Sequence, residues 1–213
     1  MKGYVLFHMW EPARQLQIEG HRFYVSQART RLLSQFNDME READKAAADW
    51  LERASHRFDP ERDDDASLYE AAHDEGIAYY QLLKDMRDNV RLSVVAGIFH
   101  EWDKQFREWI VREILHWHHG SEVRGKIWSQ DFGGLIEFFA GLGWDIRRKP
   151  YYRMLDACRL VVNVYKHGDG GSFQDLKQRF PEYIENPLEG FSDDLLGMSF
   201  MDYTNLRVTE EQI

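Results

Sequence analysis

Residues 161–172, which read VVNVYKHGDGGS, bring together residue types that could do acid–base chemistry on a phosphate. Asn163 and His167 are one helical turn apart at the end of an apolar run, and glycines follow at once. At about 100° per residue, the polar side chains here share an arc of roughly 100° on one helix face. The arc holds a guanidinium, an amide, an ammonium and an imidazole, from Arg159, Asn163, Lys166 and His167.

That set would suit metal-independent RNA cleavage, in which a 2′-hydroxyl attacks the neighbouring phosphate and cations stabilise the charge that develops. His167 would be the acid–base group, because an imidazole takes or gives a proton near neutral pH. Arg159 and Lys166 would bind the phosphate, Arg159 through a bidentate fork. Asn163 would orient the imidazole or bond a ribose.

An ordinary helix end also explains the same residues, and on spacing alone it is the favoured interpretation. Basic residues in a last turn complement the helix dipole and bond free carbonyls, and glycines end helices. In the functional interpretation, Gly168 and Gly170 let the backbone approach a ligand closely. The glycine run is not a phosphate-binding loop of the nucleotide-hydrolase type, because G-x-x-x-x-G-K-[ST] is absent.

The run RLVVNVYKHGDGGSFQDL resembles the end of the main helix in HEPN-domain proteins, the "higher eukaryotes and prokaryotes nucleotide-binding" superfamily. The helix RLSVVAGIFHEWDKQFREWI resembles an earlier helix of one uncharacterised bacterial subset, in which Glu101 would be the acidic residue after an apolar run. The resemblance covers roughly residues 68–185. The form N-x-x-K-H-G-x-G-x-S of that subset is matched by Asn163, Lys166, His167, Gly168, Gly170 and Ser172.

The resemblance implies a helical bundle that forms a homodimer, with the motif helices of two chains facing each other. It also implies an RNase that cuts RNA without a metal or cofactor, as a toxin or in phage defence, with an antitoxin or defence-system protein as a partner. Arg and His of the motif would be the catalytic pair, and Glu101 would support them from the neighbouring helix.

One departure from the motif leaves a second interpretation open. Catalytic members carry Arg just before the Asn, where this chain has Val162. Arg159, one turn earlier on the same arc, could substitute. The alternative function is a non-catalytic HEPN-like helical module that binds a protein or a nucleotide.

Composition indicates a folded, mostly helical protein without a broad basic surface. Of 213 residues, 43% are hydrophobic and 14% aromatic, enough for a substantial core. The net charge of −10 argues against tight, non-specific duplex binding. The single cysteine, the lack of a signal-peptide pattern and the absence of a long apolar run predict a soluble, cytoplasmic protein with no membrane contact.

Periodicity predicts an all-α fold, a bundle of four to five main helices in a single domain over residues 1–213. The core would span about 26–185, with 1–25 and 186–213 peripheral. Ser26 and Ser172 are expected to be N-caps, and Gly168 a left-handed stop. The expected helices cover about 26–58, 66–88, 89–117, 132–142, 150–167 and 173–180.

Four other features favour structural roles over chemistry. The cluster HWHHG, at 116–120, lacks the cysteine or acidic ligands that zinc prefers, so no metal site is predicted. The acidic run at 61–65 suits the start of the next helix. Cys158 lies on an apolar helix face and is expected to be buried. The tryptophans at 102, 109 and 117 follow helical spacing, which is typical of a core.

Overall fold

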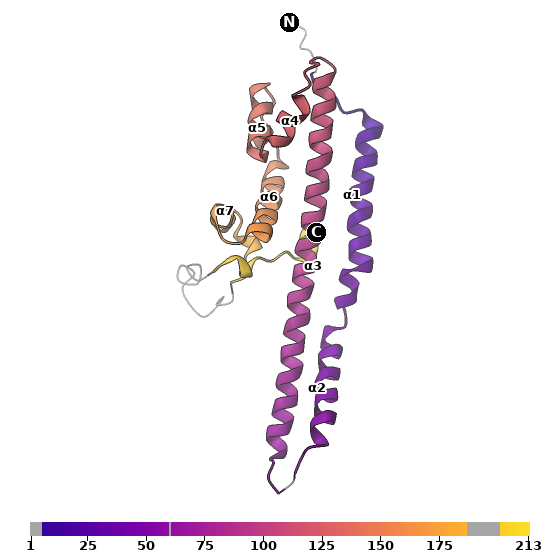
Figure 1. Cartoon of the computed structure of the whole chain (residues 1–213), viewed down its shortest axis with the longest axis vertical. Coiled ribbons are helices and arrows are strands. Elements are labelled where there is room, and N and C mark those ends of the chain that lie inside the picture. Colours follow the sequence, from indigo (N-terminus) through magenta and orange to yellow (C-terminus); the bar gives the residue numbers. More distant parts are fainter. Residues whose placement is uncertain (1–5, 60, 187–200) are drawn as a thin grey trace. The chain divides into compact units, whose positions relative to one another are not determined.

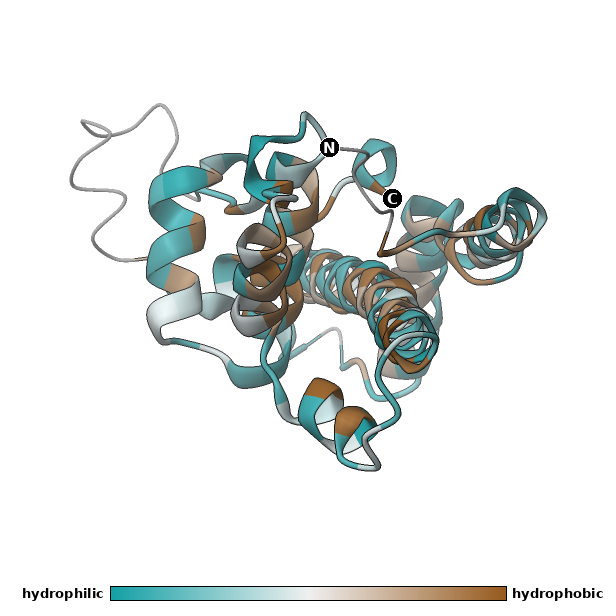
Figure 2. Cartoon of the chain, turned by 90° about the horizontal axis from the view of Figure 1, so that it is seen from above, coloured by the Kyte–Doolittle hydropathy of each residue, from teal (hydrophilic) through white to brown (hydrophobic). Residues whose placement is uncertain are grey.

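The computed structural model describes residues 6–59, 61–186 and 201–213, and within these ranges the chain is all-α, with no strand. Figure 1 shows the course of the helices, and Figure 2 shows hydrophobic and hydrophilic residues alternating around them, as in amphipathic helices. In the described part of the chain no helix combines the length and apolarity needed to cross a membrane. The helices are α1 (Glu11–Arg31), α2 (Met39–Ser55), α3 (Asp65–Leu115), α4 (Val123–Ser129), α5 (Phe132–Gly141), α6 (Tyr152–His167) and α7 (Gly171–Arg179).

Internal contacts divide the chain into two compact units. Unit 1 contains residues 1–24 and 94–213, and unit 2 contains residues 25–93. Both α1 and α3 run through a boundary, so no Gly- or Pro-rich linker marks the division. The candidate site on α6 belongs to unit 1.

The first helix begins earlier than predicted, at Glu11, where Pro12 suits the opening turn. Ser26 is therefore inside α1 and the prediction that it is an N-cap is wrong. The helix predicted over 26–58 is also interrupted, by a 3-10 turn at Leu33–Phe36, before α2 begins. Ser34 donates its hydroxyl to the Thr30 carbonyl at 2.8 Å, the kind of local side-chain bond that competes with helix continuation.

The predicted break between helices at residues 88 and 89 is wrong, because α3 is one continuous helix of 51 residues. No Gly or Pro stands near that position, so nothing in the backbone chemistry stops the helix. At its start, Asp64 accepts hydrogen bonds from the Ser67 backbone N–H at 3.2 Å and hydroxyl at 3.0 Å. These bonds lower the pKa of the Asp64 carboxyl. The acidic run thus caps a helix, as predicted.

A stack of aromatic rings forms the core of unit 1 around the second half of α3. Trp102 stacks on Phe106 with centroids 5.2 Å apart, and Phe106 and Trp109 stack in turn on Phe139 of α5. Phe7, in the N-terminal segment, packs against Phe139 with ring centroids 5.1 Å apart. The N-terminal segment therefore helps to form the core.

The helix α4 was not predicted, and a buried arginine of α3 fixes it in place. Arg107 pairs with Asp103 at 2.7 Å and donates to the carbonyls of Ile127 and Gln130 at 2.9 and 2.8 Å. These carbonyls are at the C-terminal end of α4, where backbone acceptors lack helical partners. One guanidinium thus satisfies the helix end and the carboxylate of Asp103 together.

The helix ends around the candidate site follow glycine chemistry. Gly168, at the end of α6, has a φ of 71°, which confirms the predicted stop, and Gly143, beyond α5, has a φ of 86°. The prediction that Ser172 is an N-cap is wrong. The helix α7 begins at Gly171, one residue before Ser172, and Gly170 is at the N-cap position.

The described part of the tail contributes buried residues to unit 1. Residues 183–185 and 205–207 pair by backbone hydrogen bonds of 2.8 and 2.9 Å around an antiparallel bridge between Ile184 and Leu206. Leu206 and Val208 are buried. The part of the tail at 187–200 lies outside the described residues.

Within unit 2, α2 packs closely on the first half of α3 because of Gly76. A Cβ placed on Gly76 would be 3.2 Å from the Ala47 Cβ and 3.3 Å from the Ala43 carbonyl oxygen, tighter than ordinary contact. Small residues on both helices thus let the backbones approach. A larger side chain at this position has no space.

We expect Gly76→Leu to destabilise unit 2 by about 1–3 kcal/mol, because the side chain must push α2 from α3. Gly20→Ala in α1 is the control, since nothing lies within 4 Å of its Cβ position. That change should stabilise the protein by roughly 0.5–1 kcal/mol through helix propensity. Urea unfolding followed by circular dichroism measures both. An unchanged midpoint for Gly76→Leu would contradict the close packing.

Candidate functional site

The polar face of α6 is held in place by the burial of the opposite face. Leu160, Val161 and Val164 are completely or almost completely buried in unit 1. Val162 packs with Ala96 and Phe99 of α3. Val162, the residue just before Asn163, is therefore a core residue.

His167 and Lys166 are both exposed at the last turn of α6. Directly beyond them Gly168 takes up a left-handed conformation, and the Tyr203 ring lies 3.6 Å from where a Cβ on this glycine would be. Tyr203 also donates its backbone N–H to the Asp169 carboxylate at 2.9 Å. The tail thus packs against the turn after α6 and leaves the imidazole and the ammonium open to solvent.

The turn after α6 leads directly into the N-terminus of α7. The first backbone N–H groups of that helix, at Gly171 and Ser172, form no hydrogen bond with any described residue. Apart from their neighbours in sequence, no described residue has an atom within 4 Å of a Cβ placed on Gly170 or Gly171. A phosphate at this turn would meet a helix N-terminus as well as the α6 C-terminus.

Asn163, one turn before His167, is half-buried and faces α7. Its side-chain amide is 3.5 Å from the Ser172 hydroxyl, at the limit of a hydrogen bond. The structure therefore brings together Asn163, Lys166, His167, Gly168 and Gly170 at the junction of two helices.

Arg159, which its spacing predicts to bind the phosphate, forms an ion pair within α6. Its Nε and Nη2 donate to one carboxylate oxygen of Asp156, at 2.9 and 2.7 Å. Arg179, at the end of α7, donates to the other oxygen. Asp156 is one helical turn before Arg159, so this pairing directs the guanidinium toward the start of α6 and away from His167.

The carboxylate at the centre of this cluster is almost completely buried. The Asp156 side chain is 3% exposed, against 24% for Arg159 and 45% for Arg179. Tyr152 lies one turn before Asp156. Burial is the main cause that raises the pKa of the Tyr152 hydroxyl, and the negative charge of Asp156 raises it further. Two cations around one buried carboxylate join α6 to α7.

Glu101 lies on a different face of α3 from the residues that pack on α6. It accepts hydrogen bonds from Lys104 and Gln105, both at 3.0 Å, and the Lys104 bond is the main cause that lowers its pKa. Gln105 in turn lies 3.2 Å from His21 of α1. Glu101 and residues of α1 line a cavity of about 380 Å³. No contact among the described residues joins Glu101 to His167.

Two residues of the site, Asp156 and Tyr203, received no role from the sequence. Asp156 was visible as an acid three residues before Arg159 on the polar arc, which is a spacing that favours an ion pair. Tyr203 gave no signal, because its contact with Gly168 joins residues 35 positions apart.

The other candidate motifs are not assembled into sites. The three histidines of HWHHG are exposed, and the described residues hold no cluster of three or more potential metal-ligating side chains. Trp109 is buried, Trp102 is half-buried and Trp117 is 47% exposed.

No known family, curated protein or solved structure matches this chain.

We expect Asp156→Asn to lower the free energy of unfolding by about 2–3 kcal/mol, because charge-assisted hydrogen bonds to two arginines are lost. The control is Glu182→Gln, which removes an exposed pair with Arg153 worth at most about 1 kcal/mol. Thermal and urea unfolding measure both variants. Equal effects of the two changes would contradict a structural role for the buried cluster.

Burial raises the pKa of the Cys158 thiol to about 11, from an ordinary value of 9.0. At pH 8 the thiolate fraction is then on the order of 0.001, so iodoacetamide should modify the folded protein far more slowly than the unfolded chain. Since the folded pKa is the higher one, the stability that this thiol contributes is lost as pH rises from about 9 to about 11. Mass spectrometry with and without denaturant measures the rates, and equal rates would contradict the burial.

Proposed function

We propose that this chain is a HEPN-like, metal-independent endoribonuclease in which His167 is the acid–base group. The observation that carries the proposal is the exposure of His167 and Lys166 together, beside the open turn between α6 and α7. A proton-transfer group and a cation next to each other can serve one phosphodiester.

The proposed reaction needs no metal. The His167 imidazole takes the proton of a ribose 2′-hydroxyl, whose oxygen attacks the adjacent phosphorus. The bond from phosphorus to the 5′-oxygen breaks, and that oxygen takes a proton from the imidazolium or from water. The products are a 2′,3′-cyclic phosphate and a free 5′-hydroxyl.

Charge stabilisation is assigned to Lys166 and to the start of α7. The ammonium of Lys166 is adjacent to His167 in sequence and exposed on the same turn. The unbonded N–H groups of Gly171 and Ser172 would add donors for a phosphate oxygen, supported by the positive end of the α7 dipole. Arg159 acts in this proposal as a positioning residue, because Asp156 holds its guanidinium.

The motif resemblance extends the proposal to a biological setting and an assembly. We propose a role as a toxin or in phage defence, with RNA as substrate and an antitoxin or defence protein as partner. We also propose a homodimer in which the α6 helices of two chains face each other, so that two exposed motif turns contribute to one RNA site.

A second candidate function is a non-catalytic helical module that binds a protein or a nucleotide. Two observations favour it. Val162 is a core residue where catalytic relatives carry Arg, and Arg159 is bound in an ion pair. A protein with this arrangement could keep the fold and the exposed turn for binding alone.

We expect the purified chain to cleave mixed RNA in EDTA, and His167→Ala to reduce the rate by about 100- to 10,000-fold. Lys166→Ala should lose about 100-fold, as for one donor to the developing charge. Gel analysis and mass spectrometry of the RNA ends measure the rate and detect cyclic phosphates.

His118→Ala is the matched control, since it removes another exposed histidine near a helix end and should leave cleavage unchanged. Cleavage that persists in His167→Ala would rule out this residue as the acid–base group. No cleavage by the unmodified chain, across several RNA substrates, would favour the binding module.

A further inference from the structure

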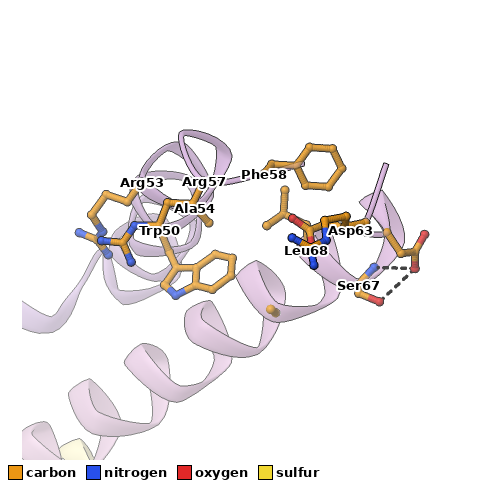
Figure 3. Close-up of a pocket in the computed structure, with 11 residues that line it drawn as sticks. Trp50, Arg53, Ala54, Arg57, Phe58, Asp63, Ser67 and Leu68 are labelled. Atoms are coloured by element: carbon orange, nitrogen blue, oxygen red, sulfur yellow. Dashed lines mark hydrogen bonds between the residues drawn. The ribbon is translucent and has the colours of Figure 1, made fainter. Parts of the chain in front are cut away.

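Unit 2 contains a cavity of about 750 Å³ near the turn that joins α2 to α3. The last turns of α2, the connecting turn and the first turns of α3 line it (Figure 3). Its volume is within the range of about 300–1,000 Å³ that small-molecule sites occupy. The lining residues are Trp50, Arg53, Ala54, Arg57, Phe58, Arg62, Asp63, Asp64, Ser67, Leu68 and Ala71.

Three arginines line this cavity, and none is paired with another described residue. The guanidinium groups of Arg53, Arg57 and Arg62 form no hydrogen bond or ion pair with any described residue. By contrast, most arginines in this acidic protein are paired, as Arg14, Arg41 and others show. Unpaired guanidiniums around one cavity are suited to an anion, because each presents a fork that matches a phosphate.

The two acids of the cavity are occupied by local hydrogen bonds. Asp64 accepts three hydrogen bonds from Ala66 and Ser67, which cap α3, and Figure 3 shows the two from Ser67 as dashed lines. Asp63 accepts the backbone N–H of Asp59 at 2.8 Å. The cavity is lined by three positively charged arginines and two negatively charged aspartates, so the net charge of its lining is positive.

Aromatic and aliphatic side chains complete the lining. Trp50 is half-buried at the end of α2, and Figure 3 shows Arg53 and Arg57 beside its indole, with Phe58 and Leu68 on the other side of the cavity. An indole and a phenyl ring can stack on a planar ring, and arginine can add a cation–π contact to that ring.

We infer that this cavity binds a nucleotide, with the base against Trp50 and Phe58 and the phosphate on Arg53, Arg57 and Arg62. The guanidiniums select the phosphate, and the aromatic side chains select a planar ring over a bare anion. The ligand is a free mononucleotide or the 5′-phosphorylated end of an RNA strand, which present the same chemistry. The inference does not rest on the proposed nuclease, because every lining residue belongs to unit 2.

Isothermal titration of the full-length chain with AMP, ATP, adenosine and inorganic phosphate tests the ligand class. AMP or ATP should bind saturably with a Kd below about 1 mM. Adenosine and phosphate alone should each bind at least about tenfold more weakly, because each lacks one of the two recognised groups. Phosphate that binds as tightly as AMP would overturn recognition of the base, and no saturable nucleotide binding at millimolar concentration would overturn the site.

Two further experiments distinguish a free nucleotide from an RNA strand end and test which residues bind the ligand. In the His167→Ala background, a 5′-phosphorylated RNA tetranucleotide that binds more tightly than AMP identifies a strand end, and weaker binding identifies a free nucleotide. Arg53→Ala, Arg57→Ala and Arg62→Ala should each weaken binding about tenfold or more. Arg57→Lys should retain part of the affinity, and Trp50→Phe should retain stacking.

Arg41→Ala is the matched control, since Arg41 is on α2 outside the cavity and its side chain is 80% exposed. It should leave nucleotide affinity unchanged. Circular dichroism checks that each variant folds. If an alanine variant fails to fold, the affinity of Arg57→Lys still tests the site. Equal loss in Arg41→Ala and in the cavity variants would show a non-specific charge effect and overturn the site.

Discussion

One buried carboxylate decides which cations near the end of α6 are open to a ligand. Asp156 is buried by the packing of α6 and α7, and a buried charge must be paired to be tolerated. It takes the guanidiniums of Arg159 and Arg179 for this purpose. The Arg159 guanidinium is thus engaged by Asp156, while Lys166 and His167 stay exposed.

The glycines after His167 have a second consequence beyond ending a helix. Gly168 reverses the chain in a conformation that favours glycine, and α7 begins only three residues later. The same short stretch therefore combines the cationic end of one helix with the open N–H groups of the next. Both features favour an anion, although the Asp169 carboxylate, which accepts a bond from Tyr203, is close by.

Unit 2 shows how an acidic chain can still present positive charge locally. The acids at the start of α3 bond the local backbone and the Ser67 hydroxyl, so they offer little to the neighbouring arginines. The net charge of −10 describes the whole chain and argues only against a broad basic surface. A cavity lined by three unpaired guanidiniums is compatible with that total.

The helices and their ends could be predicted where the signal was local. The apolar stripe of α6, the stops at Gly143 and Gly168 and the helix over 132–142 follow from side-chain periodicity and glycine conformation, which depend on neighbouring residues alone. The start of α1, the continuity of α3 and the short α4 were missed. The α4 helix depends on Arg107, twenty or more residues away in sequence, for the hydrogen bonds at its end.

The amino-acid sequence alone determined which residue types share the polar face of α6, because helical spacing sets that face before any packing occurs. Only the tertiary structure decided which of them remain available. Pairing of Asp156 with Arg179 of α7, burial of Val162 against α3 and the position of Glu101 beside α1 all depend on contacts between distant segments. No local sequence pattern encodes these contacts, because they form only once the helices have packed together.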